Sequence, residues 1–316
     1  MALVSIFTSA IAPIIAIGAV GYVLGRTRNL DVDPLNTVVV YVFAPALVFH
    51  SLATTTLDAA TVTKLVVGVT AFVLVMIALA AAVGRFAADG EPLFSAFVLT
   101  SAFANCGNFG IPLSTFAFGA VGRSTAVLFT AVQSVIMYTV GVYIASRSGG
   151  GNPLRGVRHV FAIPLVYAVV AAVGLRWLGV LPPPDGSAMR TLKLVGDSAI
   201  PLMLVMLGSE LTGTDVRAAL GSVSAVNVLK LVVAPAVAVV VVLALDPANS
   251  TAAKVFVLEC ATPVAITPLI LLVEFGPETE GLSGGEFVSA AVLTSTLLSV
   301  VTLTALIALL QSGVLL

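Results

Sequence analysis

The stretch Asn105-Cys-Gly-Asn-Phe-Gly-Ile-Pro112 interrupts a long apolar segment with two asparagines, two glycines and a proline. These residues oppose a continuous helix, because proline removes a backbone donor and clashes with the preceding turn. Inside a lipid bilayer, broken backbone is tolerated only where protein or a water-filled cavity satisfies the freed polar groups. The stretch therefore indicates a helix that is broken in mid-membrane at a functional position.

The composition of the whole chain requires a lipid environment. Of the 316 residues, 59% are hydrophobic and 9% are charged, with a net charge of −1 and a mean hydropathy of +1.16. Soluble domains carry about 25% charged residues. The scattered charges form no basic patch, so we expect no nucleic-acid partner.

Long continuous apolar segments predict helices rather than the alternating strands of a membrane barrel. We expect an all-α integral membrane protein with ten transmembrane helices, since about 20 apolar residues span a bilayer. The predicted segments are Ser5–Gly25, Pro34–Ala53, Lys64–Gly84, Pro92–Phe118, Thr125–Ala145, Val160–Val180, Lys193–Leu211, Asn227–Leu245, Thr251–Phe275 and Glu286–Leu310.

The two halves of the chain share an order of features, which predicts two five-helix repeats at 1–146 and 159–316, joined by a loop at 147–158. Lys64-Leu-Val-Val67 recurs as Lys230-Leu-Val-Val233, and Phe97-Val-Leu99 recurs as Phe256-Val-Leu258. Because each repeat has an odd number of spans, the second must enter the membrane from the opposite side. Inverted repeats of this kind are typical of secondary transporters.

A second break, Cys260-Ala-Thr-Pro-Val-Ala-Ile-Thr-Pro268, lies at the corresponding place in the second half. Paired interruptions predict crossing helices four and nine that form a binding site, although ordinary proline kinks are an alternative. Helix N-termini at the breaks would suit an anion. The candidate substrate-binding residues are Asn105, Cys106, Gly107, Asn108, Gly110, Pro112, Thr262, Pro263, Thr267 and Pro268. We predict no catalytic residue, metal ligand or cofactor site.

Two ionisable residues lie near the second break. Glu259 is inside the ninth segment, where a charge costs at least about 2.5 kcal/mol. We hypothesise that it is a coupling site for H⁺ or Na⁺; the alternative is a hydrogen-bonded packing residue. Lys230 is the second coupling candidate, as a counter-charge to Glu259 or an attraction for the anion. Alternatively, its ammonium group extends to the membrane surface.

The span-four stretch Asn105–Leu113 resembles the crossover of the auxin efflux carrier family. Phe43-Ala-Pro-Ala-Leu-Val-Phe-His50 resembles the second span of that family, and Lys230-Leu-Val-Val-Ala-Pro235 resembles the eighth. Ala261-Thr-Pro-Val-Ala-Ile-Thr-Pro268 resembles the ninth span. The resemblance covers essentially the whole chain, but the chain lacks the long central loop of the plant proteins.

The resemblance implies the fold of bile-acid sodium symporters, with a scaffold and a transport domain, and a homodimer. It also implies carriage of a small carboxylate or an auxin-like substrate, with Asn105 aligned to the asparagine that contacts the substrate carboxylate. We therefore expect a secondary transporter that exports an organic anion from the cell by alternating access. The alternative is a cation/proton exchanger of the same broad fold.

The remaining expectations concern location and chemistry. The arginines after the first span and in the central loop favour a cytoplasmic position for both loops, with the N-terminus outside the cell membrane. The two histidines, His50 and His159, lie near the ends of predicted spans. Because no constellation for hydrolysis is evident in mid-membrane, we do not expect an enzyme.

Overall fold

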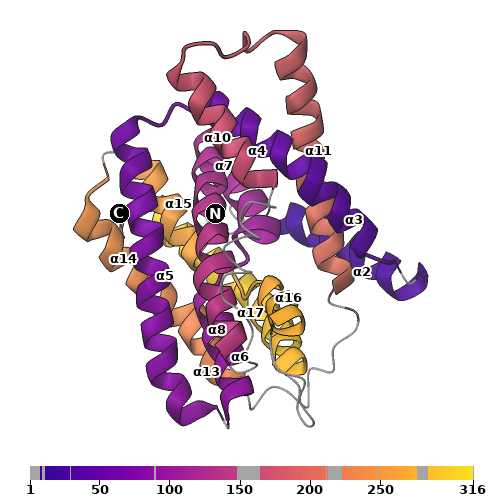
Figure 1. Ribbon diagram of the computed structural model, residues 1–316, viewed down its shortest axis with the longest axis vertical. Helices are drawn as coiled ribbons and strands as arrows, with labels where there is room; N and C mark the ends of the chain where they lie inside the picture. The colour runs from indigo at the N-terminus through magenta and orange to yellow at the C-terminus, as the bar shows by residue number, and fades with distance from the viewer. Residues whose placement is uncertain are drawn as a thin grey trace.

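The computed structural model describes residues 8, 11–28, 30–88, 90–147, 164–210, 212, 223–247, 249–275 and 284–315. This part of the chain is an elongated bundle of helices (Figure 1). The predicted central loop at 147–158 lies, beyond Arg147, outside the described residues. The helices are α2 (Ala12–Arg28), α3 (Asp33–Val38), α4 (Ala44–Ala53), α5 (Ala59–Ala87), α6 (Glu91–Ala102), α7 (Ile111–Ile136), α8 (Val142–Arg147), α10 (Pro164–Trp177), α11 (Ser187–Glu210), α13 (Ser224–Val228), α14 (Ala234–Leu245), α15 (Ser250–Cys260), α16 (Thr267–Phe275) and α17 (Gly284–Gln311).

Six continuous helical stretches among the described residues are long and apolar enough to cross a membrane. They are Asp33–Ala53, Ala59–Ala87, Cys106–Ser146, Ser187–Ser209, Ser224–Leu245 and Gly284–Gln311. The prediction of a helical, multi-pass membrane protein is confirmed. The count of ten spans and the inverted repeat stay predictions.

Proline explains several irregular turns in these helices. The π-helical turns Val39–Phe43, Cys106–Gly110 and Leu229–Val233 each end two residues before a proline. Proline has no N–H to give to the preceding turn and clashes with its carbonyl groups. A wider turn accommodates this defect and keeps the helix running.

Gly119 divides α7 into two helical parts. Its backbone angles, φ 62° and ψ −141°, are non-helical, and glycine can adopt them because it has no Cβ atom. The chain reverses there, so that a Cβ atom on Gly122 would overlap the carbonyl oxygen of Ser114. The turn follows Phe118 directly, where the fourth predicted segment ends.

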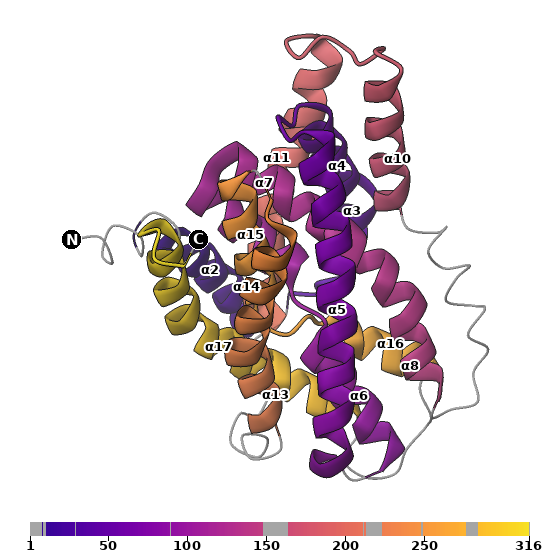
Figure 2. The same ribbon diagram turned by 90° about the vertical axis from the view of Figure 1, so that its left-hand side faces the viewer.

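The helices pack in two groups (Figure 2). Helix α11 packs against α2 and α4, and α4 packs against α10; Gly21 lets α2 approach the backbone of α11 at Val205. Helices α5, α6, α14, α15 and α17 pack together with most of α7. The groups meet mainly where α4 contacts α7 and where α11 contacts the turn Cys106–Gly110. We call them the α2–α11 group and the α5–α17 group.

Side chains define the ends of two helices in the second group. Asp58 precedes α5, and its carboxylate accepts hydrogen bonds from the backbone N–H and the hydroxyl of Thr61, at 2.7 and 3.0 Å. These bonds lower the pKa of Asp58 below its usual value. Asn249 precedes α15 and accepts from the N–H of Ala252 at 2.9 Å.

Candidate functional site

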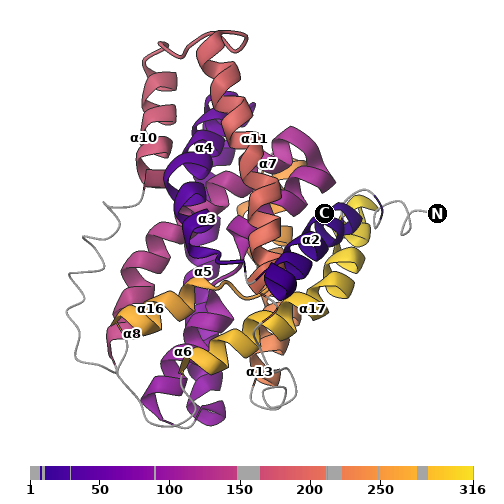
Figure 3. The same ribbon diagram turned by 90° about the vertical axis from the view of Figure 1, so that its right-hand side faces the viewer.

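The two broken segments meet in the structure. Residues 103–105, between α6 and the turn that begins at Cys106, run antiparallel to residues 263–265, between α15 and α16. Asn105 N donates to Pro263 O at 2.8 Å, and Ala265 N donates to Phe103 O at 3.3 Å. The connection into α16 crosses the bundle near mid-height (Figure 3). The predicted crossing is thus observed, and the interpretation as ordinary proline kinks is wrong.

The pairing explains how broken backbone is stable at this depth. Each extended segment supplies hydrogen-bond partners for the other, as broken backbone requires where lipid offers none. Ala104 and Val264 form the bridge at the centre. Both residues are almost fully buried, so the pairing also excludes solvent from the centre of the crossing. We call residues 103–106 and 262–265 the crossing.

One side chain from another helix fixes each half of the crossing. Gln133, on α7, donates to Ala104 O at 2.8 Å and to Cys106 Sγ at 3.0 Å, and its Oε1 accepts from Ala104 N at 3.3 Å. Ser295, on α17, accepts from Val264 N at 3.0 Å. The sequence analysis missed both residues. An amide in the middle of the apolar segment Thr125–Ala145 was the available signal for Gln133.

The predicted substrate-binding residues lie at and around the crossing. Seven of them are buried and three, at the starts of the two following helices, are partly exposed. The buried residues are Asn105, Cys106, Gly110, Pro112, Thr262, Pro263 and Pro268; the partly exposed ones are Gly107, Asn108 and Thr267. The helical chain resumes at Cys106 on one side and at Thr267 on the other. Because the first N–H groups of a helix lack partners within it, both ends suit an anion.

Glu259 lies in the last turn of α15 and is fully buried. Its Oε1 is 2.5 Å from the hydroxyl of Ser114, while Oε2 has no hydrogen-bond partner among the described residues. The carboxyl group rests against Gly110, where an added Cβ atom would overlap it. Glu259 therefore contacts the helical segment that follows the first broken segment, at Gly110 and Ser114.

Lys230 is also fully buried, with no exposed surface. The interpretation that its ammonium group reaches the membrane surface is therefore wrong. Lys230 lies in a π-helical turn that faces the end of α15, and its Nζ donates to Cys260 O at 3.1 Å. The ring centre of Phe72 is 5.9 Å from Nζ. The cation thus neutralises the partial negative charge of a helix C-terminus.

Glu259 and Lys230 do not form an ion pair in the described structure, where Asp197 is the acid in both of the ion pairs. The role of Lys230 as a direct counter-charge is therefore not supported. The described residues also contain no group of three or more histidine, cysteine or acidic residues that could hold a metal. The ionisable groups nearest the crossing are a carboxyl group without a cation and an ammonium group held by backbone.

A sequence profile described as "Membrane transport protein" matches residues 6–155 and 155–307. The chain belongs to this family, the auxin efflux carriers. Among its relatives is an "Uncharacterized transporter" of Methanothermobacter thermautotrophicus, 26% identical over 305 residues, which cover 94% of this chain and 96% of the relative. A "Putative malonate transporter" of Rhizobium meliloti is 25% identical over 321 residues, covering 98% and 97%.

These comparisons confirm the family resemblance over nearly the whole length of the chain. They also support the predictions that the protein has a transport function and that it lies in a membrane.

Proposed function

We propose that the protein is a secondary transporter that exports a small organic anion, with a carboxylate held at the crossing. The observation that carries this proposal is the pairing of Phe103–Asn105 with Pro263–Ala265, two segments that are each followed by the start of a helix, at Cys106 and at Thr267. The crossing has amide and hydroxyl groups and no carboxylate of its own. The relative named for malonate supports a dicarboxylate as the first substrate to examine.

We also propose ten membrane passes in two inverted repeats. The equivalent anchoring of Ala104 by Gln133 and of Val264 by Ser295 supports this arrangement. Each anchor comes from the last long helix of its half. Arg26 and Arg28 end α2, which supports an N-terminus outside the cell and a cytoplasmic loop after the first span. The homodimer of the family is part of the same proposal.

Alternating access would move one helix group against the other. The crossing belongs to the α5–α17 group, which would carry the substrate, while the α2–α11 group would remain the scaffold. The separate packing of the two groups, which meet mainly where α4 contacts α7 and α11 contacts Cys106–Gly110, supports this division. Rigid-body movement about a fixed site is the general mechanism of transporters with inverted repeats.

Glu259 is the proposed coupling residue for H⁺ or Na⁺. A buried carboxylate that lacks a cation is costly, and a proton or a bound cation removes that cost. The unpartnered Oε2 and the contact of the carboxyl group with Gly110 support this role. The same observation favours the second candidate function, a cation/proton exchanger in which the organic anion takes no part.

Uptake into proteoliposomes tests the proposal and separates the two candidates. Labelled mono- and dicarboxylates, including malonate and an auxin, would be offered while pH, sodium and voltage gradients are varied one at a time. We expect saturable dicarboxylate uptake that a proton or sodium gradient increases. Cation/proton exchange that needs no organic anion, with no carboxylate moved or competing, would overturn the proposal and favour the exchanger.

A further inference from the structure

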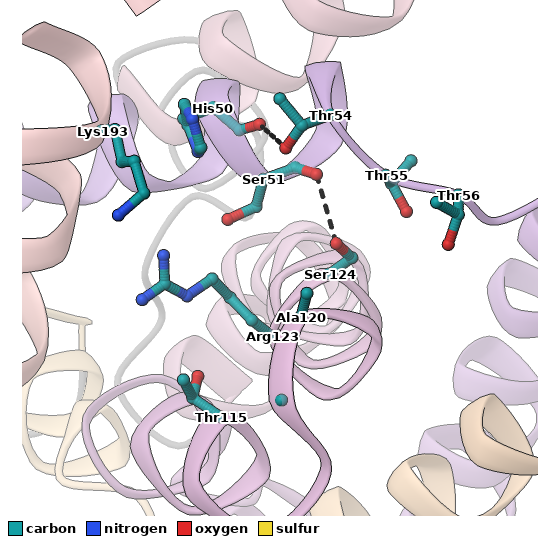
Figure 4. Close-up of a pocket in the computed structure, with 11 residues that line it drawn as sticks. His50, Ser51, Thr54, Thr55, Thr56, Thr115, Ala120, Arg123, Ser124 and Lys193 are labelled. Atoms are coloured by element: carbon teal, nitrogen blue, oxygen red, sulfur yellow. Dashed lines mark hydrogen bonds between the residues drawn. The ribbon is translucent and has the colours of Figure 1, made fainter. Parts of the chain in front are cut away.

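A polar cavity of about 300 Å³ lies beyond the crossing, between the two helix groups. It is lined by residues at the end of α4, by α7 near Gly119 and by Lys193 of α11. Its size falls at the small end of the range for small-molecule sites. Figure 4 shows Lys193, Arg123 and the hydroxyl group of Ser51 directed toward a common space. We call it the Arg123 cavity.

Two cations of the Arg123 cavity already hold a carboxylate, which belongs to the protein. Arg123 Nη1 is 2.6 Å from Asp197 Oδ1, and Lys193 Nζ is 2.6 Å from Asp197 Oδ2. Each cation thus takes one oxygen of the same carboxylate group. Charge-assisted hydrogen bonds of this kind are the stronger ones in proteins. The geometry that a carboxylate ligand would need is therefore present.

The charge in the cavity is not balanced. Arg123 and Lys193 carry two positive charges, and Asp197 carries one negative charge. The Arg123 side chain is 19% exposed and the Lys193 side chain is 59% exposed, so the guanidinium is the more enclosed of the two cations. Screening by solvent is weaker at Arg123 than at an open surface, so an added anion would be attracted to it.

A buried hydroxyl group without a partner also lines the cavity. Ser51 is 2% exposed, and its Oγ has no hydrogen-bond partner among the described residues. Buried polar groups normally have a partner, and an exception calls for a ligand or another explanation. In Figure 4 this hydroxyl group points toward the space beside Arg123 and Lys193. It could donate to a second oxygen of an anion.

The cavity is close to the crossing along one half-helix. Thr115, which lines the cavity, lies three residues after Pro112, and its neighbour Ser114 contacts Glu259. A ligand that leaves the crossing along this half-helix would reach Arg123 on the other side of the Gly119 turn. The position is that of a site on the route of a transported anion.

We propose that the Arg123 cavity is a second carboxylate-binding site, in which a small dicarboxylate replaces Asp197 on Arg123 and Lys193. The inference rests on the proposed function, because it takes the transported anion as the ligand. Since Arg123 is on α7 and Asp197 is on α11, the replacement also removes an ion pair that joins the two helix groups. Occupation of the cavity would thereby free the groups to move.

Equilibrium binding of labelled malonate to the full chain in phosphatidylcholine nanodiscs tests the proposal. We expect two classes of site in the unchanged protein. Arg123→Gln should weaken one class at least tenfold, whereas Asn105→Ala should weaken the other. Asp197→Asn should strengthen binding to the cavity several-fold, because the competing carboxylate is gone. Arg190→Gln, an exposed arginine on α11 outside the cavity, is the matched control and should bind as the unchanged protein does.

Arg123→Gln should weaken malonate binding to the cavity, whereas Asp197→Asn should strengthen it. A folding defect in Arg123→Gln would therefore not decide the outcome. One class of site that responds to Asn105→Ala alone, with no effect of Asp197→Asn, would overturn this inference and leave the proposed function standing. No binding of any carboxylate would overturn both. Loss of malonate from the cavity in nanodiscs with anionic lipid would identify a lipid headgroup as the occupant and would also overturn it.

Discussion

Glu259→Gln is expected to abolish the response of transport to a proton or sodium gradient. An amide has nearly the shape of the carboxyl group and can still bond Ser114, which lies 2.5 Å from Oε1. It cannot take up or release a proton, and it carries no charge for a cation. Gradient-driven accumulation should therefore fall at least about tenfold, which corresponds to 1.4 kcal/mol. Exchange of labelled for unlabelled substrate, which needs no gradient, should remain.

The measurement is uptake into proteoliposomes under an imposed gradient, beside exchange at equal concentrations. Glu286→Gln is the matched control, because Glu286 is an exposed residue in the first turn of α17. A Glu259→Gln variant that keeps the full proton and sodium response would remove Glu259 from the coupling mechanism. Loss of both accumulation and exchange would contradict the specific coupling role, since it would indicate a structural one.

Gln133→Leu should destabilise the crossing and abolish transport. Leucine is similar in size but cannot bond Ala104, whose N–H and carbonyl group are both held by the glutamine side chain. Each buried backbone group that loses its partner costs about 1–3 kcal/mol. We expect a lower midpoint of thermal unfolding in detergent and malonate uptake near the background of empty liposomes.

The same substitution elsewhere provides the control. Gln311 ends α17, is exposed and makes one long hydrogen bond of 3.4 Å to Ala117 O. Gln311→Leu should leave both stability and uptake nearly unchanged. If Gln133→Leu behaved like Gln311→Leu, the crossing would not depend on this side chain, and the account of how its backbone is held would be wrong.

The crossing could be predicted because its signals are local. Asparagine, glycine and proline change the backbone where they occur, so the break at Asn105–Pro112 and its counterpart at Cys260–Pro268 were visible in sequence alone. The turn at Gly119 is likewise a local effect of a glycine. Membrane insertion needed only composition, since a chain with 9% charged residues has too few to cover a soluble surface.

Long-range contacts could not be predicted in this way. Lys230 lies in an apolar segment near a predicted end, and only the packing against α15 decides that it is buried. Gln133 and Ser295 are ordinary polar residues of helices until the crossing is placed beside them. In the sequence, Arg123 falls between two predicted spans and Lys193 begins another. Their joint contact with Asp197 depends on how α7 packs near α11.

The central claim is that the crossing binds the carboxylate of the substrate, and the affinity of an Asn105→Ala variant for malonate tests it most directly. Asn227→Ala is the matched control, because Asn227 is also buried but bonds Thr294 at 3.0 Å outside the crossing. Malonate binding to both variants and to the unchanged protein would be measured in nanodiscs. We predict an affinity at least about tenfold lower for the crossing site in Asn105→Ala, or 1.4 kcal/mol, and no change in Asn227→Ala. Unchanged affinity in a correctly folded Asn105→Ala protein would contradict the claim.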